Sequence, residues 1–242
     1  MHKVFDNPQI KGLIAAFSNK VDGNMSLSFG DTRCSLENRK EFLDKLSIDY
    51  RSLICAKQVH GVGVVSVTDK DSGKGALDYE NSIADCDGFI TDRPDLPVAI
   101  LTADCLPVFI YDPKVPAVGI LHAGWRSSEA NICAAGVKLM QDKFKSEPSD
   151  LLVTFGPAMR VCCYEVSADF KSNFPFALTR RGGKLYMDLA LLNKSQLLSA
   201  GVQEKNISDL GLCTYCSHEE FFSFRREAQN AGRMISVVIL KK

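Results

Sequence analysis

The chain has 242 residues, of which 45% are hydrophobic and 24% charged, a composition typical of a soluble globular protein. Its 29 Lys and Arg residues balance its 29 Asp and Glu residues, which argues against a nucleic-acid-binding surface or a polybasic membrane anchor. No apolar run reaches the ~20 residues of a membrane-spanning helix, and residues 12–17 are too short for a signal-peptide core, so we expect a cytoplasmic protein.

Short apolar runs rich in Val, Ile and Leu predict buried β-strands, and capping residues before helical patterns predict three helices. In chain order we expect a helix over 35–46 capped by Ser35, strands at 53–56, 62–67, 98–101, 108–111 and 117–121, a helix from Ser127 or Ser128 to just before Pro148, a strand at 151–155, a helix from Asp188 to Gly201 and a strand at 235–240. Strands and helices are intermixed without strict alternation. The predicted fold class is therefore α/β or α+β, with residues 1–242 forming a single domain of mixed β-sheets flanked by helices.

Two of the predicted strands end in reactive side chains. Asp104 and Cys105 follow the strand at 98–101, and His122 follows the strand at 117–121. His60 follows a third apolar run. Reactive groups often lie at strand ends, where a rigid sheet positions them. Two imidazoles and a thiolate favour zinc, and three protein ligands leave a fourth position open, as in catalytic sites.

Two other interpretations of these residues remain. Cys105 could be a nucleophile with His122 or His60 as its base. Alternatively, these side chains could be a buried cysteine and core histidines, which the spacing alone favours because it matches no local zinc motif.

An anion-binding group is predicted after His122. A strand there runs through Gly124 into a predicted helix start, where free N–H groups and the helix dipole favour negative charge. Arg126 adds a guanidinium suited to phosphate or carboxylate, although a surface ion pair would explain it equally well. Arg225 or Arg226 could also reach phosphate, or could form the solvated end of an edge strand. Trp125 is expected in the core.

Nine cysteines are an odd number for a disulfide framework, so free thiols are expected. Cys213 and Cys216 form a CxxC motif close to His218, which is typical of a zinc or redox site. The adjacent Cys162 and Cys163 could complete it, but neighbouring cysteines are awkward as paired ligands. The simpler interpretation is a group of loop thiols near the reactive site.

Several motifs together resemble one known family. In chain order they are KQVHG at 57–61, DGFIT at 87–91, TADCLPV at 102–108, HAGWR at 122–126, GPA at 156–158, CCYEV at 162–166, CT at 213–214, FFSFRR at 221–226 and GRM at 232–234. This order is similar to that of the laccase-domain, or multicopper polyphenol oxidase, family of YfiH-like proteins. Two of these motifs, TADCLPV and HAGWR, are very specific to this family.

The resemblance implies one YfiH-like α/β domain with mixed sheets, distantly similar to cysteine hydrolases. It implies a metal site at His60, Cys105 and His122, with zinc as the cofactor and copper as the alternative. The chemistry implied is phosphorolysis of adenosine, inosine, guanosine and methylthioadenosine, and deamination of adenosine. The partners are then a purine nucleoside and phosphate, with no nucleic acid or membrane. In this scheme Arg126 and Arg225 bind phosphate, and Asp104 orients a histidine or handles a proton.

Other functions remain open. Some bacterial family members are described as peptidoglycan editing factors, so a Cys-nucleophile amidase acting on cell-wall precursors is one alternative. A copper-binding polyphenol oxidase is another, but four histidines are too few for several coppers. A non-catalytic metal-binding protein is a third. The sequence alone leaves the oligomeric state open.

The chain departs from the family pattern at three places. Residues 18–25 lack the usual arginine and paired glycines, so a substrate contact is lost there or replaced by Lys20. Ser127 stands where a glycine usually follows HAGWR, and residues 159–161 replace an Ile-Gly-Pro sequence. These changes spare the predicted metal ligands and bear on substrate preference.

Overall fold

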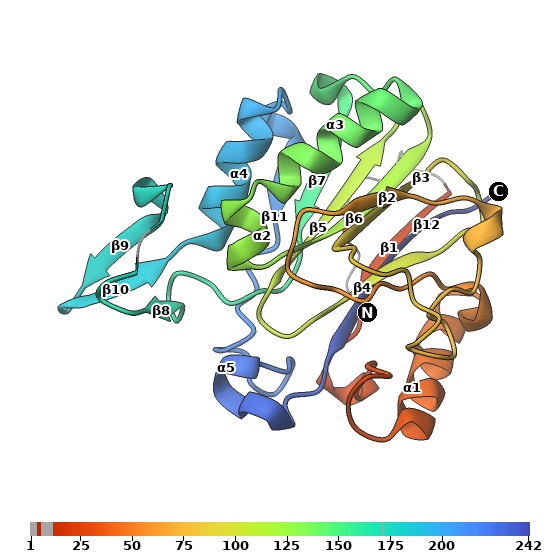
Figure 1. Ribbon diagram of the computed structural model, residues 1–242, viewed down its shortest axis with the longest axis horizontal. Coiled ribbons are helices and arrows are strands. Elements are labelled where there is room, and N and C mark those ends of the chain that lie inside the picture. Colours follow the sequence, from red (N-terminus) through yellow and green to blue (C-terminus); the bar gives the residue numbers. More distant parts are fainter. Residues whose placement is uncertain (1–3, 6–11, 171) are drawn as a thin grey trace.

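A mixed six-stranded β-sheet is central to the computed structural model, which describes residues 4–5, 12–170 and 172–242 (Figure 1). Its strand order is β11-β7-β5-β6-β3-β2, and a second, antiparallel sheet has the order β1-β12-β4. A small third sheet has the order β8-β10-β9. The strands are β1 (Leu13–Phe17), β2 (Val64–Ser66), β3 (Gly88–Thr91), β4 (Val98–Thr102), β5 (Leu106–Asp112), β6 (Ala117–Ala123), β7 (Leu152–Phe155), β8 (Glu165–Val166), β9 (Leu178–Arg181), β10 (Lys184–Met187), β11 (Ile207–Asp209) and β12 (Met234–Leu240).

The helices and sheets form four layers (Figure 1). Helices α3 and α4 cover one face of the six-stranded sheet, the β1-β12-β4 sheet packs on its other face, and α1 packs outside that sheet. The helices are α1 (Thr32–Asp44), α2 (Trp125–Glu129), α3 (Ile132–Phe144), α4 (Leu189–Ser199) and α5 (Phe224–Glu227). The predicted mixed α/β fold class is confirmed.

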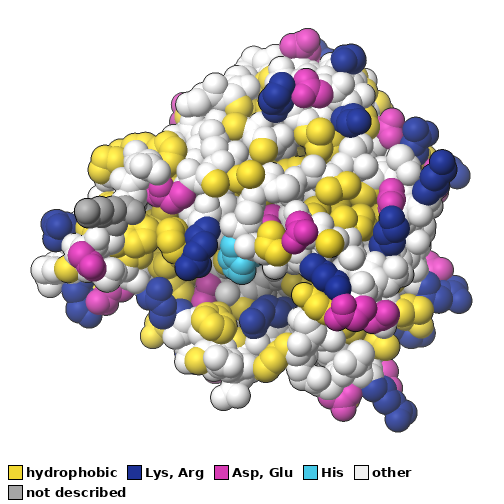
Figure 2. Space-filling model, in the orientation of Figure 1, with side chains coloured by type: hydrophobic (Ala, Val, Ile, Leu, Met, Phe, Trp, Pro, Cys, Tyr) yellow, Lys and Arg dark blue, Asp and Glu magenta, His cyan; other side chains and the backbone are white. Residues whose placement is uncertain are grey.

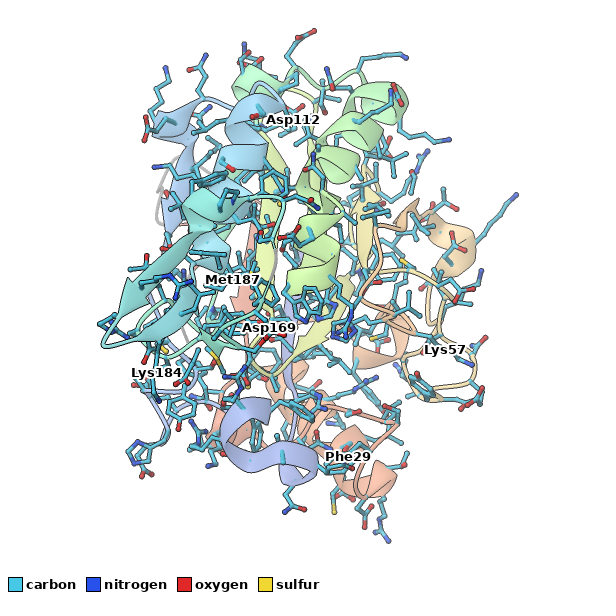
Figure 3. The ribbon with its side chains drawn as sticks, turned by 60° about the vertical axis from the view of Figure 1, so that its left-hand side comes forward. Phe29, Lys57, Asp112, Asp169, Lys184 and Met187 are labelled. Carbon is cyan, nitrogen blue, oxygen red and sulfur yellow. The ribbon has the colours of Figure 1, made fainter. Side chains whose placement is uncertain are left out.

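Alternation along β5 explains why this strand is apolar throughout. Val108 and Ile110 point toward α3 and α4, whereas Phe109 and Tyr111 point toward the β1-β12-β4 sheet. Both faces of the strand are therefore buried, which is why it appears in the sequence as a continuous apolar run. Figure 3 shows Asp112, at the end of β5, far from Phe29 at the opposite end of the molecule.

The β9–β10 hairpin extends away from these layers. Figure 3 shows β10 running inward from Lys184 to Met187, and Met187 is fully buried in the core cluster shared with α3 and α4. No helix within the described residues is long and apolar enough to cross a membrane.

Most of the predicted strands are confirmed, with shifts of a residue or two at their ends. The run at 53–56 is an exception, because its residues pair with different neighbours: Ile54 bridges to Val98 and Ala56 bridges to Ile83. The apolar run at 12–17 contains β1, a strand that was not predicted. The other strands that were missed are β3 and the short, more polar β8 to β11.

The observed N-terminal cap agrees with the prediction for α4 and differs from it for α1. Asp188 caps α4 as predicted, by accepting a hydrogen bond from the Leu191 N–H. Asp31, not Ser35, caps α1, because its carboxylate accepts two backbone N–H groups. Ser35 lies buried in the first turn of the helix.

The predicted helix from Ser127 or Ser128 is two helices. Helix α2 begins right after Gly124 and spans five residues, and α3 begins after Asn131, which has a left-handed backbone and caps it. Ser127 is buried and its hydroxyl donates to the carbonyls of His122 and Gly124. It therefore braces the loop before α2 and caps neither helix.

Arg39 offers a test of how α1 is held. Its buried guanidinium donates to the carbonyls of Met25, Gly75 and Ala76 at 2.7 to 2.9 Å. We predict that Arg39→Met lowers the free energy of unfolding by about 3 kcal/mol, because it leaves these carbonyls without donors. Lys40→Met, at the next and exposed position, should change it by about 0.5 kcal/mol or less. Equal denaturant midpoints for the two variants would contradict this account.

Candidate metal centre and its pocket

The structure brings His60, Cys105 and His122 together. Their ligand atoms lie within 4.8 Å of one another, and the two imidazole rings are 4.8 Å apart, centre to centre, at 71°. Strand pairing explains part of this arrangement. In the register of β5 and β6, Pro107 lies opposite His122, which places Cys105 beside the end of β6.

A buried carboxylate that the sequence analysis gave no role, Asp87, connects the two histidines. Its Oδ1 lies 2.8 Å from Nδ1 of His122, and both groups are buried. Its two oxygens also accept the backbone N–H groups of Val59, His60 and Gly61 at 3.1, 2.9 and 2.7 Å. A carboxylate bound to the second nitrogen of a ligating histidine fixes the ring's orientation and tautomer.

The turn that carries His60 is held in an unusual backbone conformation. His60 has φ +59°, a left-handed value that is uncommon for a residue other than glycine. Three successive N–H groups in this turn converge on the Asp87 carboxylate, as in the anion-binding nests formed by such turns. The same carboxylate therefore stabilises the turn and sets the position of the exposed His60 ring.

Charges at the site favour an ion pair between Cys105 and His122. Burial alone would raise the pKa of the Cys105 thiol, but the imidazoles of His122 and His60 lower it to about 6. Burial alone would lower the pKa of His122, but Cys105 and Asp87 raise it to about 9. Burial would likewise raise the pKa of Asp87, yet His122 and the backbone N–H groups hold it below its usual value.

Gly124 leaves room for His60 and Cys105 to approach each other. A Cβ at this position would lie 3.0 Å from the His60 ring and 3.1 Å from the Cys105 sulfur. Its φ of −77° is open to any residue, so the glycine is needed for space and not for its backbone conformation.

The three residues lie in a pocket of about 480 Å³. Figure 2 shows a histidine in a hollow near the middle of one face, with Lys or Arg side chains on either side of it. Aromatic side chains also line the pocket, from Tyr79, Trp125, Tyr164 and Phe224. Trp125, expected in the core, is a half-buried part of this wall and packs edge-to-face on Phe170.

Three arginines supply positive charge to the pocket: the predicted Arg126 and Arg225, and also Arg233. Arg126 stacks on Trp125 at 4.3 Å, and Arg225 lies over Tyr164 at 5.5 Å. Burial lowers the pKa of Arg233. Within the described part of the chain none of the three forms a carboxylate ion pair. In the sequence, the signal for Arg233 is the GRM motif at 232–234.

Other predicted residues have different partners. Arg226 donates to the carbonyls of Thr214, Tyr215 and Phe221 and holds its own loop. Lys20 pairs with Glu227 at 3.2 Å and does not line the pocket. Because α2 has only five residues, its dipole is small, so the arginines and not the helix start supply the positive charge.

Asp104 does not bond a histidine of the site. Its oxygens accept the hydroxyls of Thr214 and Ser223 and the backbone N–H of Arg225, at 2.7, 3.1 and 2.7 Å. Among the described residues, the carboxylate that bonds His122 is Asp87. The predicted orienting role therefore belongs to Asp87, and Asp104 connects the segment before Cys105 to α5.

The donor set fits a metal ion. Two imidazole nitrogens and one thiolate suit zinc, and also copper, better than calcium or magnesium, which prefer oxygen. The ligand atoms lie within 4.8 Å of one another, and tetrahedral zinc would draw them somewhat closer together. The exposed His60 ring could make this small movement.

Known proteins resemble this chain along most of its length. A family model described as "Multi-copper polyphenol oxidoreductase laccase" matches residues 16–241. The chain belongs to this family. A relative from Geobacillus stearothermophilus named "Purine nucleoside phosphorylase YlmD" is 33% identical, over 96% of this chain and 91% of its own. Another relative, from an unknown prokaryotic organism and named "Adenosine deaminase RL5", is 27% identical over 85% of this chain and 82% of its own.

A solved structure of this family has the same fold. The crystal structure of YlmD from Geobacillus stearothermophilus superposes with a TM-score of 0.91 and 31% identity, over 98% of this chain and 94% of that chain. The family resemblance that the motifs indicated is thereby confirmed.

The pKa of Cys105 can be tested on metal-free protein. We predict that this thiol ionises as the pH rises through about 6, well below its ordinary value of 9.0, because the imidazoles stabilise the thiolate. The measurement is the ultraviolet thiolate absorbance of the wild type minus that of Cys105→Ser. Asp87→Asn should move the step to higher pH, because the neutral amide no longer favours the imidazolium. A step at the ordinary value in the wild type would contradict the ion pair.

Gly124→Ala tests the close approach of the ligands. We predict that it lowers the affinity for zinc by about 10-fold or more while the protein stays folded, because the methyl group displaces His60 or Cys105. Gly61→Ala is the comparison, since its Cβ would approach other atoms no closer than 3.5 Å. Competition with a chromophoric chelator gives the affinities, and equal values for both variants would refute the prediction.

Proposed function

We propose that this protein is a zinc-dependent purine nucleoside enzyme. It cleaves adenosine, inosine, guanosine and methylthioadenosine with phosphate, and it deaminates adenosine. The observation that supports this most strongly is the placement of His60, Cys105 and His122 in a pocket with three arginines, none of which pairs with a carboxylate among the described residues. The names of two relatives, a purine nucleoside phosphorylase and an adenosine deaminase, support the same function.

A zinc ion held by these three residues would act as a Lewis acid and lower the pKa of a bound water. The ligands are held for this role by Asp87, which fixes the His122 ring and the turn of His60. Copper is the alternative ion for the same donor set. Several coppers would need many more histidines than the four in this chain, so multicopper chemistry is not proposed.

The arginines suit the anionic co-substrate. In phosphorolysis a phosphate oxygen bonds to the anomeric carbon of the ribose, and the bond to the purine nitrogen breaks. The base leaves with a proton and ribose 1-phosphate forms. Arg126, Arg225 and Arg233 would hold the phosphate and offset its charge, because guanidinium groups bind phosphate oxygens in pairs.

The pocket wall suits a flat base. The rings of Trp125, Tyr164 and Phe224 line the pocket, and aromatic side chains bind bases by stacking. Asp104 takes a positioning role in this proposal. Because it accepts hydrogen bonds from three donors, including the Arg225 backbone, it holds α5 and its arginine at the pocket.

The reaction itself can be tested directly. We predict that purified protein releases hypoxanthine from inosine only when phosphate is present. Removal of metal with a chelator should abolish the release and added zinc should restore it. Release without phosphate, or undiminished release by Cys105→Ser, would contradict the proposal.

The phosphate site makes a second prediction. Arg126→Ala should raise the KM for phosphate by about 10-fold or more, because a charge-assisted hydrogen bond to phosphate is lost. The KM for inosine should change much less. Arg33→Ala, which removes an exposed arginine that pairs with Glu37 on α1, is the control and should leave both constants unchanged. Steady-state kinetics with phosphate as the varied substrate measures the difference.

A second candidate function is a Cys-nucleophile amidase that acts on cell-wall precursors. It is favoured by the Cys105 thiol, whose pKa is lowered, beside a histidine that a carboxylate orients, which is a nucleophile–base–orienter arrangement. An acyl adduct on Cys105 in intact-protein mass spectra after incubation with muramyl peptides would support it. Zinc separates the two candidates, because it should inhibit an amidase whose nucleophile it coordinates and activate the nucleoside enzyme.

A further inference from the structure

A second group of thiols lies outside the site described above. We call Cys162, Cys163, Cys213 and Cys216 the four-thiol cluster. The four sulfurs lie within 4.8 Å of one another. Cys162 and Cys163 follow β7, and Cys213 and Cys216 lie between β11 and α5. Two segments about fifty residues apart in the chain therefore meet sulfur to sulfur.

The spacing of the sulfurs is close to that of a tetrahedral metal site. Zinc binds thiolates at about 2.3 Å, which places the sulfurs of a tetrahedron about 3.8 Å apart. The sulfur of Cys162 lies 3.5 Å from that of Cys213 and 3.7 Å from that of Cys216. The sulfurs of Cys163 and Cys216 are 3.2 Å apart, so this pair needs only a small separation. All of these distances are far longer than the roughly 2.05 Å of a disulfide.

The backbone conformation allows the adjacent residues Cys162 and Cys163 to bind the same ion. The N–H groups of Cys163 and Tyr164 both donate to the Arg160 carbonyl, at 2.9 and 2.8 Å, which closes a tight turn. This turn directs the sulfurs of Cys162 and Cys163 to the same side, where both contact Cys216.

We propose that the four-thiol cluster binds one zinc ion in a structural site separate from His60, Cys105 and His122. Four thiolates in a tetrahedron select zinc over oxygen-preferring ions. The CxxC motif is thus a ligand pair, but His218 is not its companion. That side chain is exposed, pairs with Glu219 at 3.0 Å and lies outside the cluster.

The position of the cluster gives the ion a role. It joins the segment that carries the pocket residues Met159 and Tyr164 to the segment of Thr214, whose hydroxyl donates to the pocket residue Asp104. A single backbone bridge between Ala158 and Cys213 already links them. A zinc ion would fix this link covalently and hold the wall beside Cys105.

The test uses the full chain with Cys105→Ala, which disables the first site and leaves the cluster intact. Protein is purified with a thiol reductant and analysed by elemental analysis and zinc-edge X-ray absorption. We expect one zinc per chain, with four sulfur neighbours at about 2.3 Å and no imidazole scattering. Absence of zinc after reconstitution with excess zinc would overturn the proposal, and so would a shell that contains nitrogen.

Matched variants in the same Cys105→Ala background locate the ion. Cys163→Ser with Cys216→Ser should lose that one zinc per chain, and Cys34→Ser, which removes an exposed thiol on α1, should keep it. If the double variant does not fold, the absorption spectrum of the parent protein decides alone. A disulfide between the two segments in reduced, zinc-supplied protein, seen by non-reducing peptide mapping, would refute the metal site. These results do not depend on whether the protein cleaves nucleosides.

Discussion

The Asp87 carboxylate is the interaction on which the site depends. It is fully buried. It accepts hydrogen bonds from three backbone N–H groups in the turn of His60, and it also bonds the ring of His122. A buried carboxylate without such donors would be costly, and a left-handed turn at a histidine would not persist without an acceptor. Each feature therefore stabilises the other. Together they bring two imidazoles from distant segments to one thiol.

The layered fold supplies the rest of this arrangement. Strands β5 and β6 are buried on both faces, so their register is strongly specified, and it sets Cys105 beside the end of β6. Gly124 leaves the space in which His60 and Cys105 approach each other. Residues of β4 and β6 line the pocket, and α2, α5 and the connections beside them supply the arginines and aromatic rings of its wall. Asp104 ties α5 to the segment before Cys105, and two of the connections meet at the sulfurs of the four-thiol cluster.

Much of this could be predicted from the sequence, because it depends on local patterns. Buried strands such as β5 and β12 appear as apolar runs, Asp188 precedes a helical pattern, and reactive residues after apolar runs indicated the three side chains that meet in the pocket. The role of Asp87 could not be predicted, because its partners lie 26 to 35 residues away along the chain and are set by tertiary contact. The break between α2 and α3 was missed because the left-handed Asn131 interrupts an otherwise continuous helical pattern.

The central claim is that His60, Cys105 and His122 hold one metal ion because Asp87 positions both histidines. Crystals of zinc-loaded protein, measured on both sides of the zinc absorption edge, test it most directly. We expect an anomalous peak about 2.0 to 2.3 Å from the two imidazole nitrogens and the Cys105 sulfur, with Asp87 still bonded to His122. A pocket without a peak, with His60 pointing away from Cys105, would refute the shared metal site.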